Sequence, residues 1–172
     1  MAAANSKIVY VGCRANVNRS FIVEQLLQKF VRENNLPVVV TSGGLQAHPQ
    51  APNMLAYTAQ VPQFVQALQR LGLDFIIPNI EQHRAHNFSG SELKRADLIL
   101  TMTLRQRDYL SQHTKPTTQV MMLSQLADLT REIDVFDAME APVSSYEAFV
   151  YEIAQLQYYL DYQAFRFRLG LG

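Results

Sequence analysis

The chain has one cysteine among its 172 residues, no excess of either charge, and no apolar run long enough to span a bilayer. A single cysteine excludes an internal disulfide framework and is typical of a reducing compartment. Fifteen basic and fifteen acidic side chains cancel, so neither nucleic acid nor an anionic membrane is indicated as a partner. The N-terminus lacks the apolar core of a signal peptide. We therefore expect a cytoplasmic protein.

The remaining composition is that of a globular domain rather than a disordered chain. Apolar residues make up 48% of the sequence and aromatic residues 10%, which is enough to build a hydrophobic core at this length. No repeat, low-complexity tract or long linker divides the chain. We expect residues 1–172 to form a single domain.

Short β-branched runs alternate along the chain with amphipathic segments. Four buried strands are predicted at residues 7–12, 38–41, 97–102 and 119–123. Helices are predicted at residues 20–33, 64–71 and 104–113, and a last helix is predicted to begin near Ser144 with Glu147 in a capping box. The alternation favours an α/β fold, a four-stranded parallel sheet with helices on both faces and ligands at the carboxyl ends of the strands.

Three connecting segments carry weaker patterns. Residues 73–77 predict a short extended piece, and Ser89 with Glu92 predicts a capping box that opens a brief helix. Residues 48–62 are polar and marked by prolines, which indicates a loop with some helix at the border of a cleft.

The cysteine lies at the point where the first strand meets the first helix. Cys13 directly follows the predicted strand, and Arg19 follows it by six residues. Backbone N–H groups at a helix N-terminus are unpaired and bind phosphate, and a guanidinium holds two phosphate oxygens at once. The same positive field favours the Cys13 thiolate, which is a nucleophile, and Ser20 is placed to hydrogen-bond its sulfur. Asn16 tolerates the left-handed backbone that an anion-binding loop needs. The pattern predicts a phosphatase with a phosphate-binding loop between the first strand and the first helix.

A thiolate that attacks a phosphate ester needs a proton donor for the leaving oxygen. Asp134, Asp137 and Glu140 stand at equal spacing between the fourth strand and the last helix. Their positions alone do not choose between them.

The chain resembles the low-molecular-weight protein tyrosine phosphatase family, whose signature C-x-G-N-x-C-R-S-P follows the first strand. Cys13, Asn16, Arg19 and Ser20 stand at the matching places. The resemblance extends over nearly the whole chain. The further matching segments are the Ser-Gly turn at residues 42–44, the helix and glycine at 68–72, the histidine segment at 83–85, the D-x-I-L-x-M strand at 97–102, and Asp137 where the family has an Asp-Pro pair.

This resemblance implies a role for each matching residue. Cys13 is the nucleophile, Arg19 binds phosphate and stabilises the transition state, and Asp137 is the general acid and then the base. Ser42 and His83 support the loop by hydrogen bonds. The other phosphate-binding loop residues are Arg14, Ala15, Asn16, Val17, Asn18 and Ser20. The resemblance implies no cofactor and no metal, a phosphorylated protein, especially phosphotyrosine, as substrate, and phosphate or a similar oxyanion as ligand.

Several departures from the family pattern surround the predicted site. Asn18 replaces the family's second cysteine, so oxidised Cys13 has no internal partner. The other replacements are Gly12 for valine, Arg14 for leucine, Ala15 for glycine, Phe21 for proline, Ala138 for proline, and Met139 and Glu140 for an aromatic pair. A wider, more polar entrance is expected, which weighs against strict phosphotyrosine selectivity.

Other functions remain open at this point. The clustered substitutions are also typical of a catalytically impaired module that only binds phosphate or phosphoproteins. Arsenate reductases of this fold need two further cysteines, which this chain lacks. Protein arginine phosphatases have threonine where Val17 stands, and the N-x-N-R-S pattern is similar to that of RNA polymerase serine phosphatases. The sequence leaves the oligomeric state open, and the tail at residues 166–169 is predicted either to pack back or to meet a partner.

Overall fold

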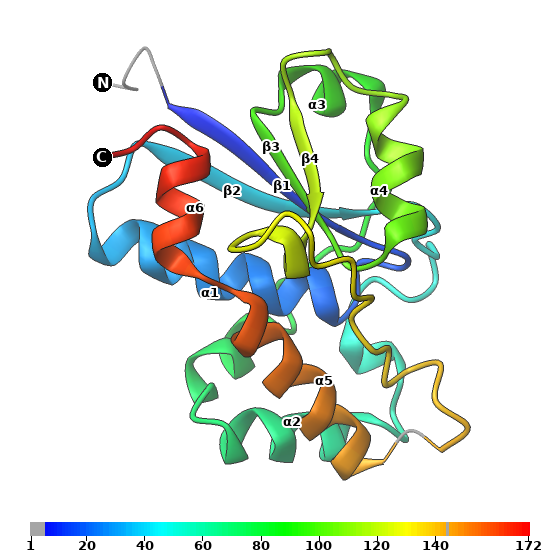
Figure 1. Ribbon diagram of the computed structural model, residues 1–172. Coiled ribbons are helices and arrows are strands. Elements are labelled where there is room, and N and C mark those ends of the chain that lie inside the picture. The colour runs from blue at the N-terminus through cyan, green and yellow to red at the C-terminus, as the bar shows by residue number, and fades with distance from the viewer. Residues whose placement is uncertain (1–5, 144) are drawn as a thin grey trace.

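The structure, a computed structural model, describes residues 6–143 and 145–172, and it is built on a four-stranded parallel sheet (Figure 1). The strands are β1 (Lys7–Cys13), β2 (Val38–Gly44), β3 (Leu98–Thr101) and β4 (Gln119–Met122). Their order is β2-β1-β3-β4, and every neighbouring pair is parallel. The predicted α/β fold is confirmed.

Helices connect these strands. The α-helices are α1 (Arg19–Glu33), α2 (Val61–Arg70), α3 (Gly90–Arg95), α4 (Leu104–Ser111), α5 (Tyr146–Tyr159) and α6 (Tyr162–Arg168). Three short 3-10 helices, η1 (Met54–Ala56), η2 (Asp74–Asn79) and η3 (Leu123–Gln125), lie between them. The capping box predicted for Ser89 and Glu92 opens α3, as expected.

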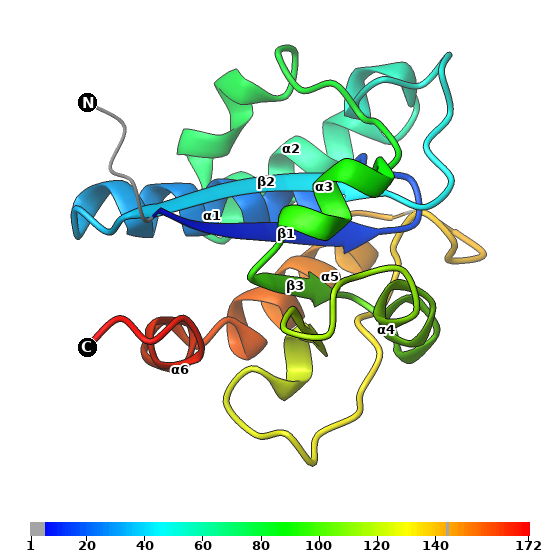
Figure 2. The ribbon, with the colours of Figure 1, turned by 90° about the horizontal axis from the view of Figure 1, so that it is seen from above.

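Alternate side chains of β1 enter two separate cores. Val9 and Val11 pack in the larger core with the apolar residues of α1 and α5, whereas Tyr10 packs on the other side with Leu93 of α3 and Leu110 of α4. Seen from above, α3 lies in front of the sheet and α1 and α5 behind it (Figure 2). The predicted covering of both faces is confirmed.

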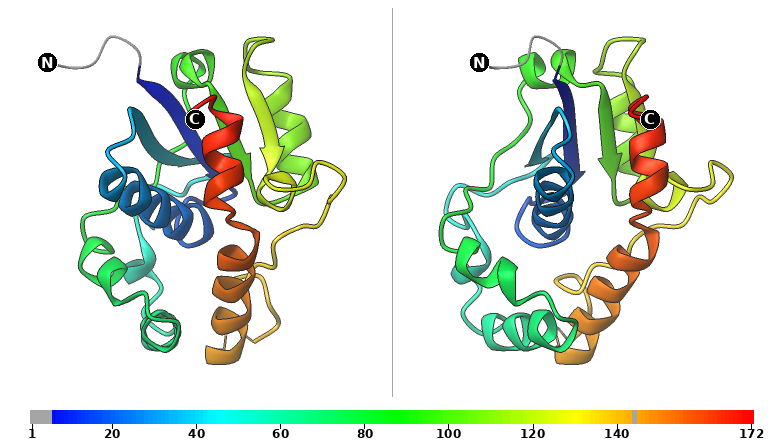
Figure 3. Two further views of the ribbon diagram at one scale, coloured as in Figure 1. Left: turned by 60° about the vertical axis from the view of Figure 1, so that its left-hand side comes forward. Right: turned by 90° about the vertical axis from the view of Figure 1, so that its left-hand side faces the viewer.

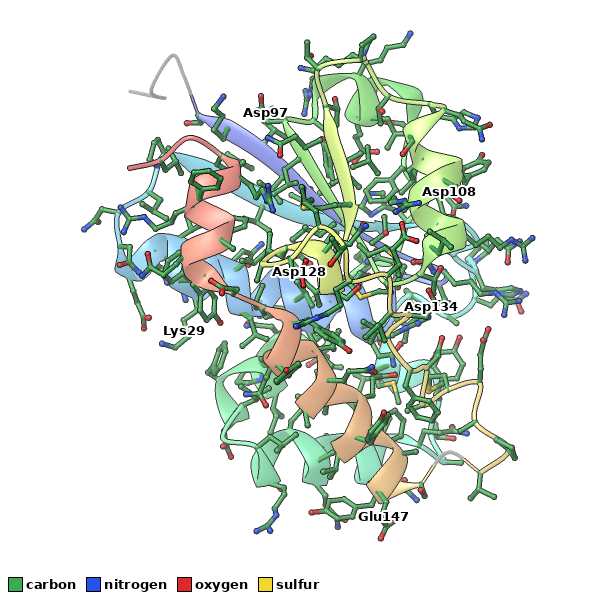
Figure 4. All side chains as sticks on the ribbon, viewed as in Figure 1. Lys29, Asp97, Asp108, Asp128, Asp134 and Glu147 are labelled. Carbon is green, nitrogen blue, oxygen red and sulfur yellow. The ribbon has the colours of Figure 1, made fainter. Side chains whose placement is uncertain are left out.

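The parallel register brings the loops that follow the strands to one edge of the sheet. Cys13 pairs with Gly44, and Gly12 pairs with Thr101. Asp97 lies at the opposite edge, where its carboxylate accepts a hydrogen bond from the Ile8 amide at 2.8 Å (Figure 4). The site is therefore assembled from the segments that leave the carboxyl ends of β1, β2 and β3.

The extended piece predicted at residues 73–77 is wrong. The chain turns at Gly72, which follows α2 with a φ of 71°, and forms the 3-10 helix η2 from Asp74. Leu73 and Ile76 are both buried, and a spacing of three residues keeps them on one side of a 3-10 helix. A short apolar run does not by itself distinguish a strand from a buried helix.

The C-terminal segment forms two helices rather than the single predicted one. Asp161 ends the first and caps the second, because its carboxylate accepts from the Ala164 amide at 2.8 Å. In α6, Tyr162 stacks on Phe30 of α1 with ring centroids 4.5 Å apart, and Phe165 is fully buried. Within the tail at residues 166–169, Leu169 is buried in the larger core while Phe167 is exposed, so this segment packs back on its own chain through Leu169. Figure 3 shows α6 alongside the sheet.

The start of α5 differs from the prediction in its capping residue. Ser144, which the predicted capping box uses, lies outside the described residues. The residue that caps α5 is Ser145, whose hydroxyl accepts from the Ala148 amide at 3.2 Å.

One aromatic ring fills the space above two glycines at the carboxyl edge of the sheet. Phe88 lies so close to Gly43 that a Cβ added there would stand 2.4 Å from the ring, and one added at Gly12 would stand 3.1 Å away. Phe88 also meets Tyr10 edge to face at 5.5 Å. Glycine is therefore required at residue 43 for packing rather than for backbone freedom.

We predict that Gly43→Ala lowers the free energy of unfolding by about 1–3 kcal/mol, because the methyl group overpacks the site against Phe88. Gly90→Ala is the matched control, since a Cβ there meets nothing within 4 Å, and it should change stability by less than about 1 kcal/mol. Urea unfolding of both variants measures the difference. Equal stability of the two variants contradicts this account of Phe88.

Candidate active site

The turn between β1 and α1 forms a loop around the sulfur of Cys13. Asn16 in this loop has a φ of 55°, the left-handed conformation expected for its residue type. Among the described residues, the amide N–H groups of Ala15, Val17 and Asn18 donate to no protein acceptor. Unpaired amides at a helix N-terminus carry a partial positive charge and attract anions.

Cys13 itself is only 2% exposed at the base of this loop. Its Sγ accepts a hydrogen bond from the Asn16 amide at 3.2 Å and lies 3.0 Å from the Ser20 hydroxyl. The predicted contact between Ser20 and the sulfur is therefore present in the structure.

Asn16 ties the loop to its surroundings through its side chain and its carbonyl. The side-chain nitrogen donates to the hydroxyls of Ser20 at 2.9 Å and Ser42 at 2.8 Å. The side-chain oxygen accepts from the His86 amide at 3.2 Å, and the backbone oxygen contacts His83 Nε2 at 2.6 Å. These hydrogen bonds hold a backbone conformation that an isolated asparagine adopts only at some energetic cost.

His83 supports the loop from outside, as the family resemblance implies. Because a carbonyl can only accept, Nε2 carries the proton that is donated to Asn16. Burial lowers the pKa of His83, so the neutral ring is favoured, although the Asn16 carbonyl opposes this. Phe21, which stands where the family has proline, packs on the His83 ring with centroids 4.6 Å apart.

Glu24 extends this network beyond the residues predicted from sequence. Ser42 donates to its carboxylate at 2.6 Å, and burial raises the pKa of Glu24. A spacing of four residues places Glu24 on the same face of α1 as Ser20, and that spacing was the signal available in the sequence.

Arg19 is 3% exposed and reaches the segment before α5. Its Nη1 donates to the Val135 carbonyl at 3.0 Å, and its Nη2 donates to the Asp137 carboxylate. Arg19 Nε is buried without any hydrogen-bond partner, and no other buried side-chain nitrogen or oxygen of the described residues is in that state. A buried donor without a partner is rare, and its presence here indicates a site for an acceptor.

The structure separates the three candidate carboxylates by their partners. Asp137 alone contacts Arg19, and its other oxygen accepts from the Met139 amide at 3.0 Å. Asp134 lies beside α4 and accepts from the Leu104 amide at 2.8 Å (Figure 4). Glu140 pairs with the exposed Arg14, so both of these carboxylates have partners away from Arg19.

A groove opens over Arg19 and Asp137 at the carboxyl edge of the sheet. It is bounded by the segments that follow β1, β2 and β3 and by the segment before α5. The lining residues are Arg14, Arg19, Leu45, Gln46, Thr103, Arg105, Gln106, Tyr109, Asp134, Val135, Asp137 and Glu140. Its wall is largely polar, and its three arginines stand beside three carboxylates, of which Glu140 pairs with Arg14 and Asp137 with Arg19.

A buried carboxylate behind the groove was not predicted from sequence. Glu152 of α5 is fully buried, and its two oxygens accept from the Asn18 side chain and from the Ala138 amide, each at 2.7 Å. Burial raises the pKa of Glu152 to about 8, and Asp137 adds to this, whereas the Ala138 amide and Arg19 oppose it. The signal in the sequence was a charged residue three positions after Phe149 and four before Leu156, on the buried stripe of the helix.

Metal clusters and membrane-spanning helices are both absent from the described residues. Within residues 6–143 and 145–172, no group of three or more His, Cys, Asp or Glu side chains is placed to hold a metal ion. No helix in the same part of the chain is both long and apolar enough to cross a bilayer.

Comparison with known proteins gives consistent matches. The family model described as Low molecular weight phosphotyrosine protein phosphatase matches residues 7–161. A Ralstonia nicotianae protein named Probable low molecular weight protein-tyrosine-phosphatase EpsP is 30% identical over 143 residues, covering 82% of this chain and 84% of the relative.

Two of the similar solved structures come from Vibrio species. A low molecular weight phosphotyrosine phosphatase from Vibrio cholerae O395 has a TM-score of 0.71 at 19% identity, over 96% of this chain and 97% of its own. Vibrio vulnificus Wzb in complex with benzylphosphonate has a TM-score of 0.66 at 21% identity, over 97% of this chain and 100% of its own. At these identities the two structures establish a shared fold.

We predict that Glu152 makes the protein less stable as the pH rises from about 5 to about 8. Between the unfolded value of 4.5 and the folded pKa of about 8, the folded chain holds a proton that the unfolded chain has lost. The free energy of unfolding therefore falls with pH by up to about 1.4 kcal/mol per unit. Glu152→Gln has no such proton and lacks this contribution.

Urea unfolding of both proteins across this pH range measures the effect. At each pH, the free energy of unfolding of Glu152→Gln is subtracted from that of the wild type. The pKa values of Glu24 and His83 are also shifted, but both proteins contain these residues, so their contributions cancel. A difference that stays constant with pH contradicts the raised pKa of Glu152.

Proposed function

The chain belongs to the low molecular weight phosphotyrosine protein phosphatase family, and we propose that it hydrolyses protein phosphotyrosine through a cysteinyl-phosphate intermediate. Family membership makes it a cysteine-dependent phosphatase that acts on phosphoric monoesters. The observation that carries the mechanism is Arg19 Nε, buried without a partner in the loop that also holds Cys13. We take residues 1–172 as one catalytic domain, and the reduced thiol that it needs fits a cytoplasmic setting.

Phosphate binding begins with an exchange of partners at Arg19. In the structure its Nη2 donates to Asp137, while its Nε has no acceptor. A phosphoryl group offers oxygens to both nitrogens at once and to the free amides of Ala15, Val17 and Asn18. Binding therefore releases the Asp137 carboxyl from Arg19, so that it can carry a proton to the leaving oxygen.

In the first chemical step, the Cys13 thiolate attacks phosphorus. The S–P bond forms and the bond from phosphorus to the ester oxygen breaks, while Asp137 gives its proton to that oxygen. Arg19 and the loop amides stabilise the charge on the three equatorial oxygens of phosphorus.

In the second step, Asp137 removes a proton from water as the water oxygen attacks phosphorus. The P–S bond breaks and the Cys13 thiolate leaves. The Asn16 amide, 3.2 Å from the sulfur, and the Ser20 hydroxyl, 3.0 Å away, donate hydrogen bonds to the sulfur as its negative charge returns.

The groove supports an aryl phosphate as substrate. Leu45 and Tyr109 give it apolar surface for a ring, and Arg105 adds a positive charge, whereas the charge of Arg14 is paired with Glu140. Wzb of Vibrio vulnificus binds benzylphosphonate, an aryl analogue of the same shape. Phosphotyrosine in a peptide with acidic neighbours fits both features, and we expect its kcat/KM to exceed that of phosphoserine in the same peptide.

The alternative is a module that binds phosphate without turning it over. The substitutions around the loop favour it, because Asn18 and Ala138 stand where the family has cysteine and proline. Vanadate binding that is lost in Arg19→Ala, without turnover by the wild type, would identify this function instead.

We predict that Cys13→Ser abolishes hydrolysis of para-nitrophenyl phosphate and that Asp137→Ala lowers kcat by about 10²–10⁴-fold, because the base that activates water in the second step is lost. Asp134→Asn and Glu140→Gln are the matched controls from the same segment, and each should lower kcat by less than about tenfold. Steady-state rates across pH measure all four variants. Activity that survives in Cys13→Ser contradicts the mechanism.

A further inference from the structure

One carboxylate joins the two segments that must cooperate in the proposed reaction. Glu152 accepts from Asn18, which precedes Arg19 in the phosphate-binding loop, and from the amide of Ala138, which follows Asp137. Both donor–acceptor distances are 2.7 Å, and Glu152 is fully buried. It thus connects the loop that binds phosphate to the segment that carries the general acid.

We propose that Glu152 is a positioning residue that fixes the Asp137 segment against the phosphate-binding loop. The inference rests on the proposed roles of Cys13 and Asp137 and adds a residue to them. Glu152 acts through Ala138 and Asn18 and does not touch the substrate.

The residues at the two donor positions both depart from the family pattern. The family pattern has cysteine where Asn18 stands and proline where Ala138 stands. A thiol is a weak donor and proline has no N–H, so that pair would leave the buried carboxylate without its two strong hydrogen bonds. A buried carboxylate that loses its donors is destabilised. Asn18, Ala138 and Glu152 therefore form one interdependent set.

The arrangement also replaces a constraint that the family obtains from proline. The proline ring fixes φ of the residue after the general acid, and Ala138 lacks that restriction. Its N–H is held by Glu152 instead, and Ala138 is the next residue in the chain after Asp137. With the Met139 amide bonded to the Asp137 carboxylate at 3.0 Å, both the backbone and the side chain of the acid are held in place.

Loss of the hydrogen bonds to Glu152 should mainly slow the transfer of a proton from Asp137 to the leaving group. A catalytic group displaced by about 1 Å loses on the order of 10²-fold in rate. Phenyl phosphate releases a basic phenolate that needs the proton, whereas para-nitrophenyl phosphate releases an acidic phenol that leaves without it. The ratio of the two rates therefore reports the placement of Asp137.

The experiment compares kcat/KM for the two esters in wild type, Glu152→Ala and Glu147→Ala. We expect Glu152→Ala to lower the rate for phenyl phosphate about 10–100-fold more than that for para-nitrophenyl phosphate, in the direction of Asp137→Ala. Glu147→Ala is the matched control, because Glu147 is exposed at the far end of the same helix and should leave the ratio unchanged (Figure 4).

Two further variants keep the test decisive if Glu152→Ala folds poorly. In Glu152→Gln the side-chain oxygen can still accept from the Ala138 amide. Its side-chain nitrogen can donate to the Asn18 side-chain oxygen once the Asn18 amide is flipped, so the ratio should stay near that of the wild type. Asn18→Ala removes the other donor to Glu152 and keeps the loop amide, and we expect it to shift the ratio in the same direction as Glu152→Ala. In the double variant that combines Glu152→Ala with Asn18→Ala, the shifts in the ratio that the two single variants cause should not add, because both remove the same contact.

The outcomes separate this inference from the function on which it depends. Equal losses on both esters in Glu152→Ala, or an unchanged ratio in Asn18→Ala, overturn the positioning role while leaving the phosphatase mechanism intact. Turnover by Cys13→Ser in the same assay overturns the mechanism itself. A shifted ratio in Glu152→Ala and Asn18→Ala, with Glu147→Ala unaffected, supports the proposal.

Discussion

The left-handed backbone of Asn16 turns the chain around the sulfur of Cys13, and the rest of the site is arranged to hold that turn. Its φ of 55° brings the Asn16 amide to 3.2 Å from Sγ. Ser20, Ser42, His83 and the backbone of His86 hold the conformation through hydrogen bonds from three separate parts of the chain. The sheet brings these parts together, because the parallel strands end at one edge.

Four residues that differ from the family pattern each make a specific contact in this structure. Gly12 stands where the family has valine, and the ring of Phe88 fills the space above it. Phe21 replaces proline and packs on His83. Asn18 and Ala138 both donate to Glu152. These four departures thus each have a contact at the same place, which is more typical of an intact site than of one that is being lost.

Much of the fold was predictable from the sequence because its patterns are local. Strand and helix periodicities and the Ser89–Glu92 capping box identified the elements of the sheet and its layers. The second helix at the C-terminus escaped prediction, because Asp161 both interrupts the apolar pattern and caps α6. Residues 73–77 were predicted as extended, because a short buried run fits a strand and a 3-10 helix equally.

The candidate site could be proposed from the sequence only where a local pattern or the family motif marks it. Cys13, Arg19, Ser20 and Asp137 follow the motif, whereas Glu152 depends on contacts between α5 and two distant loops that no local pattern encodes. Spacing alone could not choose among the three carboxylates before α5. That choice is supported by a tertiary contact, the hydrogen bond from Arg19 to Asp137.

The central claim, that phosphate passes through Cys13, is tested most directly by trapping the intermediate. The wild type and Asp137→Ala are mixed with para-nitrophenyl phosphate carrying a labelled phosphoryl group, quenched rapidly in acid, and mapped by peptide. The account predicts label on the peptide that contains Cys13, with more of it in Asp137→Ala, where hydrolysis of the S–P bond is slowed. Label on a different side chain, or a burst of nitrophenolate with no labelled protein, contradicts it.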